Sequence, residues 1–133
     1  MISDTYIVDS DALLKLLFHA DGNNSFCSDA ELDLFDECRY YTYSIVVPTH
    51  CVFEVLDKVR LGRLAASQST MTSDKMFTLL EKILTEYNCQ LEVFGEKCLH
   101  YLFECFFSHE QPLSSYLNQK LAEFHTAIEL FGE

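Results

Sequence analysis

Two acidic residues occupy positions where a sheet-based active site would hold them. Asp9 ends a β-branched and aromatic run over residues 5–9, directly before a helical pattern of leucines. Glu54 follows Pro48 by six residues, in a helix predicted after a second apolar run. Carboxylates bind hard divalent cations such as Mg²⁺ and Mn²⁺, and such a cation generates hydroxide near neutral pH and stabilises charge on a phosphate. The two acids therefore indicate metal-assisted hydrolysis if the fold brings them together.

Each acid also has a simpler structural interpretation. Asp9 or Ser10 would serve only as the N-cap of the helix that begins beside Asp11. Glu54 lies off the apolar stripe of Val52, Val55, Leu56 and Val59, so it would belong to a solvated helix face. Replacing both acids with alanine is expected to abolish any metal-assisted cleavage. Folding is expected to stay intact, because neither acid lies on an apolar stripe.

The elements that must position these acids alternate along the chain. Strand patterns occupy residues 5–9, 44–48 and 90–94, and helical patterns begin near residues 11, 28, 49, 73, 96 and 113. The order β-α-α-β-α-α-β-α-α predicts an α/β fold with a short parallel sheet flanked by helices in three layers. Ligands of such sheets bind outside the carboxyl ends of the strands, so we expect Asp9 and Glu54 to converge there.

The helical patterns also predict which side chains are buried. Ser28 and Glu31 have the spacing of a capping box, and Thr49 is a plausible N-cap. The inward positions expected for the last two helices are Leu99, Leu102, Phe103 and Phe106, followed by Leu117, Leu121, Phe124 and Ile128. Continuing the last helix this far places Asn118, His125 and Glu129 on one face.

Composition predicts one domain over residues 1–133, in which 49% of the residues are hydrophobic. No secretory leader and no apolar run long enough to span a bilayer is apparent, so we expect a cytoplasmic protein without a membrane partner. Four of the six cysteines lie in periodic apolar segments, which favours reduced, buried thiols. No Cys-x-x-Cys pair is present, which argues against a structural zinc site.

The net charge is −12, from 9 Lys and Arg against 21 Asp and Glu. This charge opposes approach to a phosphate backbone and suits divalent cations or a basic protein partner. The local basic cluster consists of Lys58, Arg60 and Arg63, beside the helix that carries Glu54. A small-molecule-binding doubly wound domain is disfavoured because no Gly-rich phosphate loop follows any predicted strand.

Three segments resemble the PIN domain. Its opening strand and first acid resemble residues 7–14, IVDSDALL, and its second strand and helical glutamate resemble residues 47–56, VPTHCVFEVL. The strand, helix and loop before its third acid resemble residues 91–109 and 112–114. Together these matches extend over nearly the whole chain in the family's order.

The resemblance implies a metal-dependent endoribonuclease, of the kind that forms the toxin half of a toxin–antitoxin pair. Asp9 and Glu54 would bind Mg²⁺ or Mn²⁺. The third acid of the family falls at Leu117, expected to be core, and Asn118 is its nearest polar substitute, expected to edge the cleft. We also expect no fourth strand with a last acid. Metal binding should therefore be weak.

The resemblance further implies a homodimer and an antitoxin-like inhibitor that inserts a basic side chain among the acids. The alternative is a catalytically degenerate PIN-like domain that acts as a protein-interaction module. That alternative accounts for the missing third acid and for the charge of −12.

Overall fold

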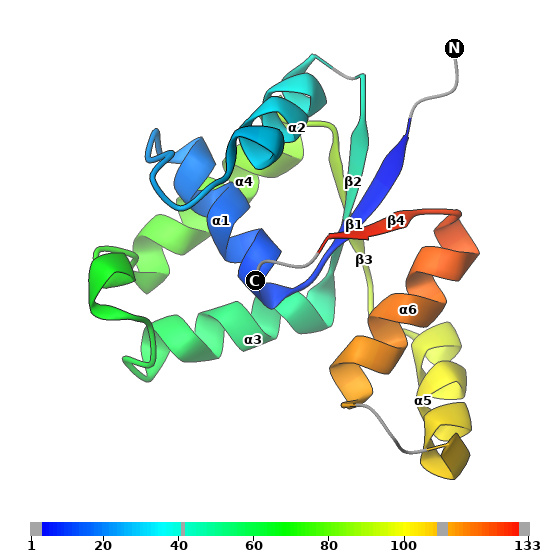
Figure 1. Cartoon of the computed structure of the whole chain (residues 1–133). Coiled ribbons are helices and arrows are strands. Elements are labelled where there is room, and N and C mark those ends of the chain that lie inside the picture. The colour runs from blue at the N-terminus through cyan, green and yellow to red at the C-terminus, as the bar shows by residue number, and fades with distance from the viewer. Residues whose placement is uncertain (1–3, 41, 109–111, 131–133) are drawn as a thin grey trace.

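The computed structural model describes residues 4–40, 42–108 and 112–130, and for residues 105–108 the backbone alone. The first half contains β1 (Thr5–Val8), α1 (Ser10–Ala20), α2 (Asp29–Arg39), β2 (Ser44–Pro48), α3 (Thr49–Arg60) and the 3₁₀ turn η1 (Ala66–Gln68). The second half contains α4 (Ser73–Glu86), β3 (Cys89–Glu92), α5 (Glu96–Ser108), α6 (Leu113–His125) and β4 (Ile128–Leu130). The predicted order is confirmed, with β4 added at its end (Figure 1).

The four strands form one parallel sheet in the order β3-β2-β1-β4. Val8, Ile45 and Val47 enter the larger core on one face, and Ile7 and Val46 enter the smaller core on the other. This alternation follows from the two-residue period of a strand. It explains why β2 is a continuous apolar run, since both of its faces are covered.

Helices cover both faces of the sheet (Figure 1). The larger core contains buried side chains of α1, α2, α3 and α4, and the smaller core contains those of α5 and α6. The predicted three-layer α/β architecture is thus confirmed. Among the described residues, no helix is both long enough and apolar enough to cross a bilayer.

Side-chain caps explain where several helices begin. The capping box of Ser28 and Glu31 opens α2 as predicted, and the Thr72 hydroxyl accepts from the backbone N–H of Lys75 to open α4. Thr49 is not the N-cap of α3, because Pro48 occupies that position. The Thr49 hydroxyl instead donates a 2.7 Å hydrogen bond to the carbonyl of Glu92, which connects the beginning of α3 to β3.

The last predicted helix was extended too far. It ends at His125, and Thr126 adopts a left-handed conformation with φ of 52°, which stops the helix before β4. Leu117 and Leu121 are buried as predicted, but Phe124 and Ile128 are 57% and 53% exposed. The expectation of no fourth strand was wrong, because residues 128–130 pair with β1.

The predicted inward face of α5 was also partly wrong. Leu99 and Phe103 are 45% and 64% exposed, whereas Cys98 is buried and Leu102 packs against the smaller core. This helix packs mainly against α6 at the margin of the sheet, so it buries only a narrow stripe. The side chain of Phe106 lies outside the described residues. The five described cysteines are free thiols, as predicted, but Cys27 and Cys89 are only partly buried. The side chain of Cys105 also lies outside the described residues.

Candidate active site at the carboxyl edge of the sheet

Asp9 is the N-cap of α1 and directly follows β1. Its Oδ1 accepts a 2.8 Å hydrogen bond from the backbone N–H of Ala12. Its own backbone N–H donates to the carbonyl of Leu130 at 3.1 Å, which fastens the end of β4 to the same place. The capping interpretation of Asp9 is therefore confirmed, and the half-buried carboxylate is held at the sheet edge.

Glu54 lies in the second turn of α3 and is exposed, as its position off the apolar stripe predicts. Its Oε1 accepts a 2.7 Å hydrogen bond from the hydroxyl of Ser114, in the first turn of α6. Two helices that are distant in the sequence therefore meet at this carboxylate.

Asn118 is buried, with 5% of its surface exposed, so it does not edge an open cleft as predicted. Its Nδ2 donates a 3.1 Å hydrogen bond to the carbonyl of Val8, and its Oδ1 accepts a 2.6 Å bond from Nε2 of His50. The Cys51 thiol also donates to Oδ1, at 3.7 Å. A buried amide requires such partners, and Asn118 finds them on β1 and α3.

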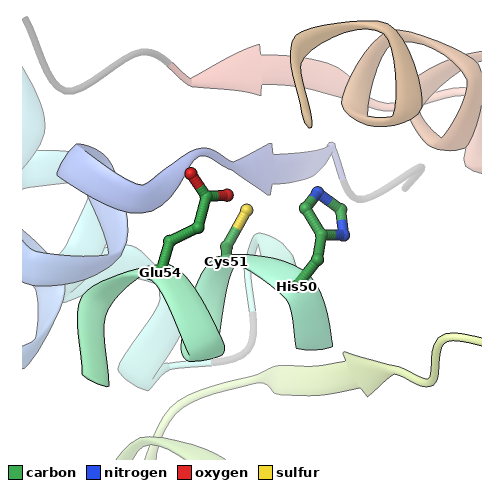
Figure 2. Close-up of side chains that lie close together, drawn as sticks. All are labelled: His50, Cys51 and Glu54. Carbon is green, nitrogen blue, oxygen red and sulfur yellow. The ribbon is translucent and has the colours of Figure 1, made fainter. Parts of the chain in front are cut away.

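His50, Cys51 and Glu54 form a compact group of potential metal ligands on α3. One ligand atom from each lies within 4.8 Å of the others. Figure 2 shows the three side chains on the same side of α3, directed toward β1. Sequence reasoning missed His50 and Cys51. The available signal was their spacing from Glu54, because helix positions three and four residues apart lie on the same face.

Burial dominates the electrostatics of this group. It lowers the pKa of His50, opposed by the hydrogen bond to Asn118 and by the charge of Glu54. It raises the pKa of the Cys51 thiol to about 12, and the charges of Glu54 and, more weakly, Asp9 act in the same direction. Hydrogen bonds of the thiol with Asn118 and Ser10 oppose that shift. The binding of a common ion by Asp9 and Glu54 remains a prediction.

Glu129 is a further acid that sequence reasoning misplaced on a helix. It lies in β4, paired with Ile7 of β1. Burial raises its pKa, and the negative charges of Glu123 and Asp9 raise it further. A strand of three residues carries almost no periodic signal, so only pairing with β1 reveals that Glu129 lies near Asp9.

A cavity of about 250 Å³ opens beside Glu54, between α3, α5 and α6. His50, Glu54 and Ser114 contribute its polar groups, and the remaining lining is apolar, including Leu102 and Leu117. Water and a small ion therefore have access to the outer side of the His50–Glu54 group.

The predicted basic cluster is partly neutralised within the chain. Lys58 pairs with Asp11 at 3.2 Å and Arg60 pairs with Asp57 at 3.2 Å. Both pairs are substantially exposed, and exposed pairs of this kind contribute little stability, so an incoming phosphate can compete for the basic groups.

The donor set fits a hard cation in part. Asp9 and Glu54 offer carboxylate oxygens, which suit Mg²⁺ or Mn²⁺. Asn118 fits less well, because its oxygen already accepts hydrogen bonds from His50 and Cys51 and would have to release at least one of them.

Comparisons with known proteins find a similarity in fold and none in sequence. No family model and no curated protein sequence matches the chain. The structure is similar to a chain in the crystal structure of VapBC2 from Rickettsia felis bound to a DNA fragment from their promoter, with a TM-score of 0.60 and 12% sequence identity. The match covers 94% of this chain and 84% of that chain. The fold is therefore PIN-like, as the sequence predicts.

Proposed function

We propose that this protein is a PIN-like endoribonuclease that hydrolyses phosphodiester bonds with weakly bound Mg²⁺ or Mn²⁺. The observation that carries the proposal is the placement of Asp9 and Glu54. They come from separate elements, after β1 and within α3, at the carboxyl edge of a parallel sheet. The Cys51 thiol of α3 donates to the carbonyl of Val8, the residue before Asp9, at 3.6 Å. That edge is where open α/β sheets bind ligands.

Asp9 and Glu54 would hold the metal, and Glu129 in β4, whose pKa the charge of Asp9 raises, is a candidate for a further carboxylate. A bound Mg²⁺ or Mn²⁺ supplies hydroxide near neutral pH and stabilises the charge on the phosphate. The N-cap hydrogen bond orients Asp9, and the Ser114 hydroxyl orients Glu54. Lys58 and Arg63 would contact RNA phosphates outside the acidic edge.

We also propose an antitoxin-like partner. The chain that resembles this one in fold comes from the crystal structure of VapBC2 bound to a DNA fragment from the VapBC2 promoter. With a charge of −12, this chain is poorly suited to bind nucleic acid unaided, whereas it would attract a basic protein. A basic side chain of that partner would pair with Glu54, which is exposed. Homodimer formation remains a prediction from the family resemblance.

One observation favours the second candidate, a degenerate domain that acts as an interaction module. Asn118 is the polar residue next to Leu117, where the third acid of the family falls. Its side-chain amide is hydrogen-bonded to Val8, His50 and Cys51. A site built in this way has less negative charge for a metal than the full family site. It also needs no metal to satisfy its buried polar atoms.

Cleavage of a mixed RNA pool tests the two candidates. The parent protein should cut in Mn²⁺ and not in EDTA. Asp9→Asn and Glu54→Gln should each lower the rate by about 100-fold or more, because each removes a charged ligand of the metal that stabilises the charge on the phosphate. Asp29→Asn is the matched control, since it removes an exposed acid from the first turn of α2 and should leave the rate unchanged.

If both site variants cut as fast as the parent, the activity belongs to a contaminant and the interaction module becomes the better account. If the parent does not cut in Mn²⁺ or Mg²⁺ while remaining folded, the nuclease proposal fails directly. Circular dichroism of each preparation establishes that folding is retained.

A further inference from the structure

We infer that His50, Cys51, Glu54 and Asn118 form a binding site for a borderline-soft divalent transition ion, with Zn²⁺ as the best chemical match. This site shares Glu54 with the proposed hard-cation site but has a different donor set. It does not require the chain to be a nuclease, because it rests on the positions of these four side chains.

The distances between the donor atoms support this site. Ligand atoms of His50, Cys51 and Glu54 all lie within 4.8 Å of one another. Asn118 Oδ1 lies 2.6 Å from His50 Nε2 and 3.7 Å from Cys51 Sγ. Tetrahedral zinc with ordinary bond lengths separates its donors by about 3.3–3.6 Å. The two separations of Asn118 Oδ1 fall on both sides of that value, so binding requires His50 and Asn118 to move apart.

The donor chemistry selects the class of ion. Nitrogen, sulfur and oxygen donors together suit Zn²⁺ or Co²⁺, whereas Mg²⁺ requires oxygen ligands. On α3, Cys51 and Glu54 are three residues apart and His50 and Glu54 are four apart, which are the spacings that place side chains on one helix face. Zinc sites with two histidines four residues apart on a helix use the same geometry.

The surroundings suit a bound ion. Cys51 is fully buried, and its thiol donates long hydrogen bonds, at 3.6 Å to the Val8 carbonyl and 3.7 Å to Asn118. Glu54 is exposed and lines the cavity beside His50, which gives an ion a route from solvent. Binding replaces the His50–Asn118 hydrogen bond and releases the thiol proton of Cys51 to solvent.

Co²⁺ is the probe of choice, because its spectrum reports both ligand type and geometry. Titration of the full chain should show one ion per molecule, with intense visible bands of tetrahedral Co²⁺ and a near-ultraviolet thiolate charge-transfer band, and Zn²⁺ should displace it. Cys51→Ser should remove the charge-transfer band and weaken binding by more than about 100-fold, beyond the loss expected for an outer-sphere partner. Cys27→Ser changes a partly buried thiol outside this donor set, so it is the control and should change neither.

A weak octahedral spectrum without the thiolate band overturns the inference, as does an unchanged band in Cys51→Ser. Circular dichroism checks folding, and if Cys51→Ser is unfolded, the exposed Glu54→Gln variant decides. It should bind Co²⁺ at least tenfold more weakly and retain the thiolate band, whereas equal affinity overturns the site. Asp9→Asn is outside this donor set and should leave Co²⁺ binding intact, so failure here is distinguishable from failure of the nuclease proposal.

Discussion

The side-chain amide of Asn118 donates a 3.1 Å hydrogen bond to the backbone carbonyl of Val8, the residue before Asp9. This bond attaches α6 to the carboxyl end of β1, across 110 positions of sequence. The residue nearest to the family's third acid therefore holds the site together as a neutral amide. Without any metal, Asn118 already has a structural role, because it connects α6 to β1.

Asn118→Asp should lower the free energy of unfolding by about 1–3 kcal/mol without metal, because a carboxylate oxygen then faces the Val8 carbonyl. Mn²⁺ should restore part of the loss and bind more tightly than to the parent. Denaturant unfolding with and without Mn²⁺ measures both effects. The matched control is Asn88→Asp, which removes a similar 3.1 Å bond to Tyr43 on another part of the sheet. Equal rescue of both variants by Mn²⁺ would contradict the prediction.

Asp9→Ala should lower the free energy of unfolding by about 1 kcal/mol, because it removes the N-cap of α1. Asp9→Asn should stay within a few tenths of a kcal/mol of the parent, since asparagine also caps helices. A loss of this size is compatible with an intact fold, so the expectation that alanine at this position leaves folding intact remains a prediction. Chemical denaturation of the two variants side by side decides, and equal stability would show that the cap contributes nothing.

Mn²⁺ should bind weakly. Asp9 and Glu54 provide two carboxylates, while the oxygen of Asn118 already accepts from His50 and Cys51. The affinity of such sites decreases when fewer of the ligands are charged. Calorimetry of the parent and of Asp9→Asn measures this directly. Tight stoichiometric binding that disappears in Asp9→Asn would mean that another residue, with Glu129 the first candidate, is a strong ligand.

RNA binding should depend on salt through the basic side chains beside α3. In an Asp9→Asn background, which prevents cleavage, Lys58→Gln and Arg63→Gln should each reduce the log–log salt slope by about 0.7 for single-stranded RNA. Lys75→Gln is the control, because Lys75 pairs with Asp21 near the beginning of α4. Fluorescence anisotropy at several salt concentrations measures the slopes. Equal slopes for all variants would show that Lys58 and Arg63 do not contact RNA phosphates.

His19 should make the fold sensitive to acid. Burial lowers its pKa below 6.5, with partial opposition from the charge of Asp36. Below pH 6.5 the unfolded chain therefore binds more protons at this residue than the folded chain, so its contribution to stability is complete above that pH and falls as the pH drops. His19→Gln should flatten the decline in unfolding free energy between pH 7 and 5. An unchanged slope would show that other groups cause the decline.

Most of the helices and strands can be predicted from local sequence patterns. The run over residues 44–48 is apolar at nearly every position, so it predicts a strand covered on both faces. Ser28 and Glu31 predict the beginning of α2 because a capping box needs only four consecutive residues. Asp9 could be placed at the sheet edge because a strand pattern ends and a helix pattern begins there.

Only the tertiary structure decided the composition of the site and the end of the sheet. The His50–Asn118 hydrogen bond joins residues 68 positions apart, so no local pattern indicates it. Strand β4 exists because residues 128–130 pair with β1, and three residues are too few to show a period of their own. Phe103 is exposed despite its helical spacing, because periodicity identifies a face and the neighbouring elements determine how much of it is covered.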